Sequence, residues 1–157
     1  MSEHKIRDRA EAVRWRSAVE GPVVFTNGVF DLLHPGHVKL LEQARALGRA
    51  LIVGINGDQS ARKLGKGRGR PVNSAADRAR VLAALAAVDC VVIFDEDTPE
   101  ALIRELEPDI LVKGSDYRAD QLPGRAAVEE RGGRVMLIDL LPGYSTSAII
   151  ERIRGAS

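Results

Sequence analysis

Cysteine and aromatic residues are scarce in this chain of 157 residues, and each scarcity excludes a class of protein. The single cysteine, Cys90, excludes a disulfide within the chain and a zinc site built from several cysteines, so a reducing cytoplasm is the expected compartment. Its apolar neighbours, 91–93, indicate a buried thiol. Aromatic residues make up only 4%, which gives little material for a surface that stacks single-stranded bases.

An excess of one charge and long apolar runs are also missing. Lys and Arg number 23 against 22 Asp and Glu, a net charge of +1, so we expect no nucleic-acid or membrane partner, and any anion site must be local. The charged N-terminal segment has no apolar core of a signal peptide. No stretch approaches the roughly 18 apolar residues of a membrane span.

What is present is an alternation of short apolar runs and longer amphipathic segments from residue 22 onward, typical of parallel strands joined by crossover helices. We therefore expect one domain over 1–157, an α/β Rossmann-like three-layer sandwich with a five-stranded parallel sheet, in which residues 1–20 form an added helix. The expected strands are Val23–Thr26, Leu51–Ile55, Cys90–Phe94, Ile110–Lys113 and Val135–Ile138.

Helices are predicted between these strands. Apolar residues at helical spacing cover 38–47, and Thr98 before Pro99 offers an N-cap and a first helical residue. The other predicted helices are 75–87, 98–106, 124–131 and 147–154. Ligands of such folds bind beyond the carboxyl ends of the strands. We therefore expect the chemistry in the loops after the first, second, fourth and fifth strands.

The segment TNGVFDLLHPGH, residues 26–37, lies between the first strand and its helix. His34 and His37 would share one helical face, and Gly36 between them would let a ligand approach the backbone. A helix N-terminus favours anions, so a phosphate chain is the expected ligand. Two alternatives stay open: His34 caps the helix with His37 half-buried on it, or the pair binds a metal, to which only Asp31 could add a ligand.

Two motifs resemble those of a known family. GVFDLLHPGH at 28–37 resembles the first signature of the cytidylyltransferase-like nucleotidyltransferases, and YSTS at 144–147 resembles their second, with similarity over about 22–154. The resemblance implies transfer of a nucleoside monophosphate from a nucleoside triphosphate, with release of pyrophosphate.

Four further segments narrow the resemblance. NGD at 56–58, RPVN at 70–73, FDEDTP at 94–99 and VKGSDY at 112–117 are similar to the adenylyltransferase half of bifunctional ADP-heptose synthases. Those proteins also carry a sugar kinase domain, for which 157 residues leave no room. The resemblance implies a stand-alone enzyme that transfers AMP from ATP to D-glycero-β-D-manno-heptose 1-phosphate, for lipopolysaccharide inner-core synthesis. It also implies a homo-oligomer.

The resemblance and the expected positions together give a candidate site. The residues expected in catalysis are His34, His37, Arg70 and Lys113. Those expected to bind the nucleotide are Asn27, Gly28, Val29, Phe30, His34, Gly36, His37, Arg78, Tyr144, Ser145, Thr146 and Ser147. Those expected to bind the sugar phosphate are Asp31, Asn56, Asp58, Lys66, Arg68, Gly114, Asp116 and Tyr117. No resident metal is expected; Mg²⁺ would enter with ATP, held largely by phosphates and water.

The proposed nucleophile, a phosphate oxygen, is already ionised, so catalysis needs alignment and charge neutralisation. The segment GKGRGR, 65–70, supplies three cations on a flexible tether, although a disordered basic loop is the alternative. Arg78 near a helix start opposes the dipole, which indicates a ligand or a simple ion pair. The hydroxyls of 145–147 indicate a second anion site or an N-cap. The acidic run 95–97 offers acceptors for sugar hydroxyls, but an acidic run after a strand is usually solvated, so it is left outside the site.

Other functions stay open. A cytidylyltransferase acting on glycerol 3-phosphate would keep the chemistry, but Leu140 stands where that relative has a nucleotide-binding Arg. A non-catalytic module that senses ATP would need neither both histidines nor a second substrate pocket. A nucleic-acid module would have to depend on GKGRGR alone.

Overall fold

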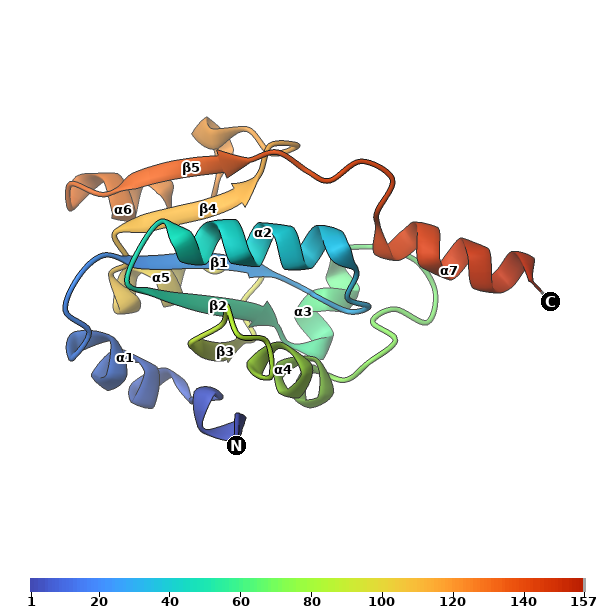
Figure 1. Ribbon diagram of the computed structural model, residues 1–157, viewed down its shortest axis with the longest axis horizontal. Coiled ribbons are helices and arrows are strands. Elements are labelled where there is room, and N and C mark those ends of the chain that lie inside the picture. The colour runs from blue at the N-terminus through green and yellow to red at the C-terminus, as the bar shows by residue number, and fades with distance from the viewer. Residues whose placement is uncertain (157) are drawn as a thin grey trace.

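The computed structural model describes residues 1–156 as three layers, with helices on both faces of one sheet (Figure 1). All five strands are parallel and lie in the order β3-β2-β1-β4-β5. The strands are β1 Val23–Gly28, β2 Ala50–Asn56, β3 Cys90–Phe94, β4 Ile110–Gly114 and β5 Arg134–Ile138. The predicted fold class is therefore confirmed, and the strands begin or end within two residues of the predicted bounds.

Helices connect the strands and cover the sheet. Apolar side chains of α2 and α4 pack on one face, and those of α1, α5 and α6 pack on the other. The α-helices are α1 Arg9–Ser17, α2 Pro35–Ala46, α3 Asp58–Lys63, α4 Ala75–Ala83, α5 Glu100–Leu106, α6 Arg125–Glu130 and α7 Thr146–Gly155; two 3₁₀ turns, η1 Glu3–Lys5 and η2 Ala119–Gln121, complete the described elements.

The core lies on both sides of the central strands. Every residue of β2 is buried, as expected for a parallel strand with both faces covered. Leu41 from α2 and Leu82 from α4 are fully buried on one side, while Leu102 and Leu106 from α5 are buried on the other. These two apolar layers fix the position of the strand ends, where the loops form the candidate site.

Three local predictions were wrong. Residues 1–20 do not form one helix: the turn η1 precedes α1, which Asp8 and Glu11 begin with a capping box. The helix α3 was not predicted, because six residues after a strand show no apolar periodicity. Thr98 does not cap α5, whose N-cap is Pro99.

The chain order places a topological switch point between β1 and β4. From β1 the chain moves outward through β2 to β3, and then returns across the sheet to β4 and β5. The loops that follow β1 and β4 therefore diverge at the carboxyl edge, where such folds bind ligands. Helix α7 stands beyond this same edge, away from the sheet (Figure 1). No helix within residues 1–156 is long and apolar enough to cross a membrane.

Candidate active site

A cavity of about 540 Å³ opens at the carboxyl edge of the sheet. Its lining comes from the ends of β1, β2 and β4, the start of α2, the loop after α3, and the segment before α7. Of the predicted site residues, those that line the cavity are Asn27, Gly28, Val29, Phe30, Asp31, His34, Gly36, His37, Asn56, Lys66, Arg70, Lys113, Asp116, Tyr117, Tyr144, Ser145, Thr146 and Ser147. Segments up to about 120 residues apart in the sequence thus meet at one place, as the parallel topology requires.

The two histidines lie against each other at the start of α2. Their ring centroids are 3.9 Å apart. His34 is the N-cap of α2, and its Nδ1 accepts a hydrogen bond from the Gly36 backbone N–H at 3.1 Å. The Nδ1 of His37 accepts a longer bond, 3.3 Å, from the His34 N–H. The cap that was considered as an alternative to phosphate binding is therefore present, through one nitrogen of the ring.

These contacts determine the tautomer of both rings. A ring nitrogen that accepts a hydrogen bond carries no proton, so the neutral form of His34 and of His37 is protonated at Nε2. Burial lowers the pKa of His34, and burial together with the neighbouring His34 lowers the pKa of His37 to about 4. Near pH 7 both side chains are thus neutral N–H donors at the cavity.

Two glycines of the motif make room for aromatic rings. A Cβ on Gly36 would lie 2.8 Å from Cε1 of His34, and one on Gly28 would lie 2.9 Å from Cε2 of Phe30. Phe30 itself is buried and adopts a left-handed backbone conformation, φ 51°. Gly36 was expected to admit a ligand; in the structure it admits the His34 ring, and its N–H already serves the cap.

Arg70 brings the basic loop to the start of α7. Its guanidinium donates to the Lys66 carbonyl oxygen at 3.2 Å and to Oγ of Ser147 at 3.0 Å. Lys66 and Arg70 both line the cavity, whereas Arg68, predicted to bind the sugar phosphate, does not. The loop therefore directs two of its three cations to the site.

Lys113 reaches the cavity from the end of β4. Its Nζ donates to the Asn27 carbonyl oxygen at 2.8 Å and lies 4.5 Å from the centre of the Tyr117 ring. The pKa of Lys113 is lowered to about 8, mainly by burial and also by nearby Lys66, while Asp116 opposes the shift. Burial also raises the pKa of the Tyr117 phenol. Lys113 is thus a cation held between two strand ends, in reach of a phosphate. Gly114 beside it was also predicted to bind substrate but does not line the cavity.

The three hydroxyls before and within α7 have separate contacts. Ser145 is the N-cap and accepts from the Ala148 N–H at 3.0 Å. The Thr146 hydroxyl donates to the Leu32 carbonyl oxygen at 2.9 Å, and Ser147 accepts from Arg70. Tyr144 stacks at 6.1 Å on His34. This second motif therefore joins α7 to the first motif and to the basic loop.

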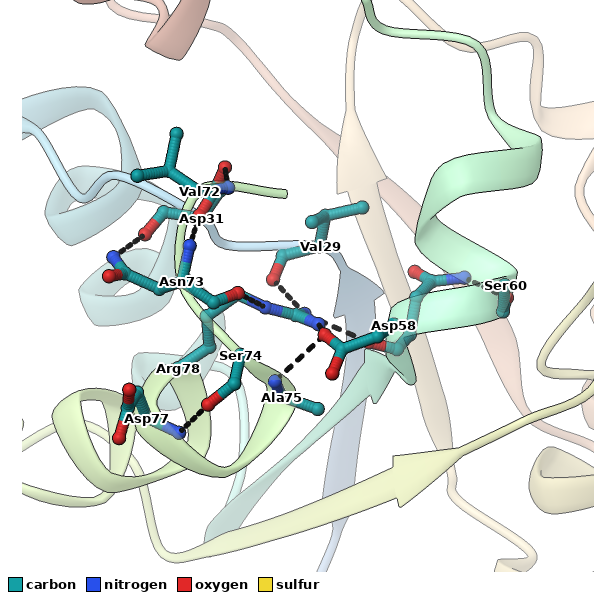
Figure 2. Close-up of polar contacts among 11 residues, drawn as sticks. Val29, Asp31, Asp58, Ser60, Val72, Asn73, Ser74, Ala75, Asp77 and Arg78 are labelled. Atoms are coloured by element: carbon teal, nitrogen blue, oxygen red, sulfur yellow. Dashed lines mark hydrogen bonds and ion pairs between the residues drawn. The ribbon is translucent and has the colours of Figure 1, made fainter. Parts of the chain in front are cut away.

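Arg78 occupies a different place from the one predicted. It was expected to bind nucleotide, but it does not line the cavity and is only 1% exposed. Figure 2 shows its guanidinium pointing from α4 into a ring of oxygens: it donates to the backbone carbonyls of Asn73, Val29 and Asn56, and pairs with the Asp58 carboxylate at 2.9 Å. Arg78 is therefore a structural residue, since its bonds are made within the protein.

Asp58 and Asp31 are likewise engaged in structure. Asp58 was predicted to bind substrate; it lies outside the cavity lining, where it accepts from Arg78 and from the Ala75 N–H. Asp31 does line the cavity, but its two oxygens accept from the backbone N–H groups of Val72 and Asn73 (Figure 2). These carboxylates hold the segment after the basic loop in place.

Sequence reasoning missed part of the lining. The loop after β3 contributes Asp97, Thr98 and Pro99, although the acidic run 95–97 was left outside the site. A signal was available, because β3 ends at the same edge as its parallel neighbours. The other unpredicted lining residues are mostly apolar: Leu40, Ala61, Leu64, Pro71, Leu111, Leu122, Pro123, Leu140 and Leu141.

The charged and imidazole groups of the cavity lining indicate which kind of ligand it suits. Among the described residues, no group of three or more His, Cys, Asp or Glu is placed to hold a metal ion. The lining includes the two imidazoles and the cations Lys66, Arg70 and Lys113. Such a set suits phosphate groups, which would bring their own Mg²⁺.

Comparison with known proteins places this geometry in a family. The cytidylyltransferase-like family model matches residues 25–152. D-beta-D-heptose 1-phosphate adenylyltransferase from Bordetella bronchiseptica is 52% identical, over 97% of this chain and 95% of that protein. Bifunctional protein HldE from Acidiphilium cryptum is 58% identical over 91% of this chain, but the chain spans only 29% of that relative's length.

Solved structures agree with this placement. The lipopolysaccharide core biosynthesis protein from Thermoplasma volcanium has a TM-score of 0.65 and 28% identity, over 78% of this chain and 98% of that one. Pantoate-beta-alanine ligase from Francisella tularensis, at 14% identity over 95% of this chain and 76% of that one, shares the fold with a TM-score of 0.61. This chain therefore belongs to the cytidylyltransferase-like family.

Proposed function

We propose that this protein is a nucleotidyltransferase that transfers AMP from ATP to D-glycero-β-D-manno-heptose 1-phosphate, giving ADP-heptose and pyrophosphate. The observation that carries the proposal is the pair of neutral imidazoles, His34 and His37, beside three cations in one cavity. The choice of acceptor is supported by the Bordetella relative, which is named for this reaction and is 52% identical over nearly its whole length.

In the proposed reaction, an oxygen of the sugar 1-phosphate attacks the α-phosphorus of ATP. A new P–O bond forms there while the bond to the β-phosphate oxygen breaks, and pyrophosphate leaves with that electron pair. The nucleophile is already an anion, so no side chain has to remove a proton. Catalysis comes from holding two anions in line and from neutralising the charge that develops on the transferred and leaving groups.

Each group that lines the cavity has a role in this scheme. The Nε2–H groups of His34 and His37 donate to phosphate oxygens that gain charge in the transition state. Lys113 attracts the phosphates of both substrates from the end of β4, and Lys66 and Arg70 do so from the basic loop. Mg²⁺ arrives as part of MgATP, coordinated by phosphates and water.

The test is ATP-dependent pyrophosphate release with heptose 1-phosphate, in wild type and in His34→Asn and His37→Asn variants. Asparagine keeps an acceptor for the backbone N–H that each Nδ1 now binds, but has no Nε2–H, so the variants should fold and lose about 10²–10³ in kcat. The matched control is His4→Asn, because His4 is exposed and lies outside the cavity.

A panel of ATP and CTP with heptose 1-phosphate and glycerol 3-phosphate completes the experiment, with products identified by mass. Turnover only with CTP and glycerol 3-phosphate would show that the proposed substrates are wrong, and it would leave the proposed nucleotidyl transfer unchanged. Saturable ATP binding without turnover of any pair would replace the enzyme by a nucleotide-binding module. Full activity in both histidine variants would remove the roles assigned to the imidazoles.

A further inference from the structure

Three carboxylates line the cavity, and they differ in what they contact. Asp31 uses both oxygens to hold the backbone of 72–73. Asp116 lies close enough to Lys113 to raise its pKa. The Asp97 carboxylate pairs with Lys63 at 3.1 Å. Both side chains are about 70% exposed, so this pair is weak and easily exchanged for another partner.

The turn that carries Asp97 is nevertheless held firmly. The Ser60 hydroxyl donates to the Glu96 carbonyl oxygen at 3.0 Å, and the Gly57 N–H donates to the Phe94 carbonyl oxygen at 2.8 Å. The Glu96 side chain is turned outward to a two-bond ion pair with Arg9. Of the acidic run 95–97, only Asp97 lines the cavity, on a backbone fixed from two sides.

The surroundings of Asp97 suit a neutral polar ligand. Its sequence neighbours Thr98 and Pro99 also line the cavity, while the cations and imidazoles of the lining belong to other segments. A carboxylate repels phosphate but accepts strong hydrogen bonds from hydroxyl groups. Apolar Leu122 and Pro123, also in the lining, offer a surface for the C–H groups of a sugar ring.

We propose that Asp97 binds a hydroxyl group of the acceptor and thereby selects a polyhydroxylated sugar phosphate over a shorter polyol phosphate. This inference rests on the proposed function, and it assigns the loop after β3 to acceptor recognition. The phosphate of the acceptor lies toward Lys113, and its hydroxyls extend to Asp97 and Thr98. Asp97 takes no part in ATP binding.

The experiment compares Asp97→Asn and Asp97→Ala with wild type in steady-state assays that vary heptose 1-phosphate and ATP separately. The expected result is a rise of about 10- to 100-fold in KM for the sugar phosphate in Asp97→Ala, and a smaller rise in Asp97→Asn. The KM for ATP and the kcat at saturation should stay within about threefold of wild type, because a loss confined to acceptor binding affects only one KM.

Two controls separate this role from a structural one. Asp95→Asn makes the same chemical change two residues away, outside the cavity lining, and Lys63→Gln removes the ion-pair partner while leaving the Asp97 carboxylate. Both should keep the wild-type KM for the sugar phosphate. Because Asp97 is exposed, its variants should also melt at the wild-type temperature.

The outcomes distinguish this inference from the proposed function. Wild-type turnover of heptose 1-phosphate with unchanged KM in both Asp97 variants would overturn the inference alone. An equal rise in the KM for ATP would also overturn it. If wild type turns over a different acceptor, the proposed acceptor fails and Asp97 is tested with that acceptor. If no protein shows turnover, calorimetric titration of heptose 1-phosphate in the presence of ATP compares its affinity for wild type and for the Asp97 variants. Equal affinities in wild type and variants would overturn the role of Asp97.

Discussion

Lys113 illustrates how the environment of one side chain sets its chemistry. Its ammonium group is packed between the Asn27 carbonyl and the Tyr117 ring, and burial lowers its pKa to about 8. The group is therefore charged below about pH 8 and loses its proton as the pH rises through that value. A bound phosphate would reverse the shift, because an anion favours the charged form.

We predict that kcat/KM for ATP falls as the pH rises above about 8, since free enzyme with neutral Lys113 binds phosphate less well. Lys113→Arg keeps its charge to higher pH and should show no such fall, whatever its absolute activity. His37, with its pKa lowered to about 4, should add no titration between pH 6 and 9.

The measurement is the pH profile of kcat/KM between about pH 6 and 10, in wild type and Lys113→Arg. A flat wild-type profile, or the same fall in both proteins, would show that Lys113 does not control ATP binding.

Single residues also show what a sequence can and cannot indicate. The spacing of His34 and His37 was enough to predict their shared place at a helix start. The position of Arg78 near a helix start also stands out in the sequence, but the structure buries the side chain outside the cavity lining, and the sequence does not indicate this placement. Its acceptors on Val29 and Asn56 lie 49 and 22 residues away, and only the folded sheet brings these carbonyls together.

At the scale of elements, Arg78 joins four parts of the fold that lie apart in the sequence. From α4 it bonds to the loop after β1, the end of β2, the start of α3 and the segment before α4 (Figure 2). Val29 and Asn56 also line the cavity, so the same bonds that stabilise the fold set the position of the cavity wall.

We predict that Arg78→Met destabilises the protein by about 3–5 kcal/mol, because it leaves buried carbonyl oxygens and Asp58 without their donor. Arg78→Lys should also be destabilised, since one ammonium group cannot reach all four acceptors. Asp58→Asn is the matched comparison. Its side chain is 37% exposed and keeps an acceptor oxygen, so a loss of only about 1–2 kcal/mol is expected.

Urea unfolding measures these free energies, with circular dichroism as the signal. An Arg78→Met variant as stable as wild type would contradict the structural role and restore the case for a ligand.

The elements themselves were predictable to different degrees. Parallel strands of such a sheet appear as short, continuous apolar runs, and this pattern was enough to predict all five, including the partly exposed edge strand β5. Helix α3 was missed because it is too short to show a period, although acidic Asp58 at its start and basic Lys63 at its end are the charges a helix prefers. The loop after β3 carries no motif that marks it as part of the cavity, so only the parallel arrangement of β3 with its neighbours indicates its place there.

At the scale of the whole molecule, a net charge of +1 coexists with a local set of positive groups. Lys66, Arg70 and Lys113 converge on one cavity, while cations elsewhere, such as Arg9 and Arg16, pair with carboxylates. The positive field is therefore short-ranged, and attraction to phosphate should depend on the cavity and not on the surface as a whole.

We predict that the KM for ATP rises with salt. Arg70→Gln should raise the KM at low salt and reduce this dependence, because it removes a partly exposed cation from the cavity. The assay varies KCl from about 25 to 300 mM. As a comparison, anisotropy of a labelled single-stranded RNA should show no saturable binding at about 150 mM salt. Tight RNA binding that Arg70→Gln abolishes would instead make the basic loop a nucleic-acid contact.

The double use of the two histidine rings has an evolutionary consequence. One nitrogen of each ring bonds to the backbone around the start of α2, while the other is available to substrate. Selection for folding and selection for activity therefore act on the same two positions. In a lineage that abandoned the reaction, we expect the exposed cations of the basic loop to drift first and the histidines to persist. In a distant descendant, an intact pair of histidines would therefore indicate common ancestry, and it would not by itself show that the protein still catalyses the reaction.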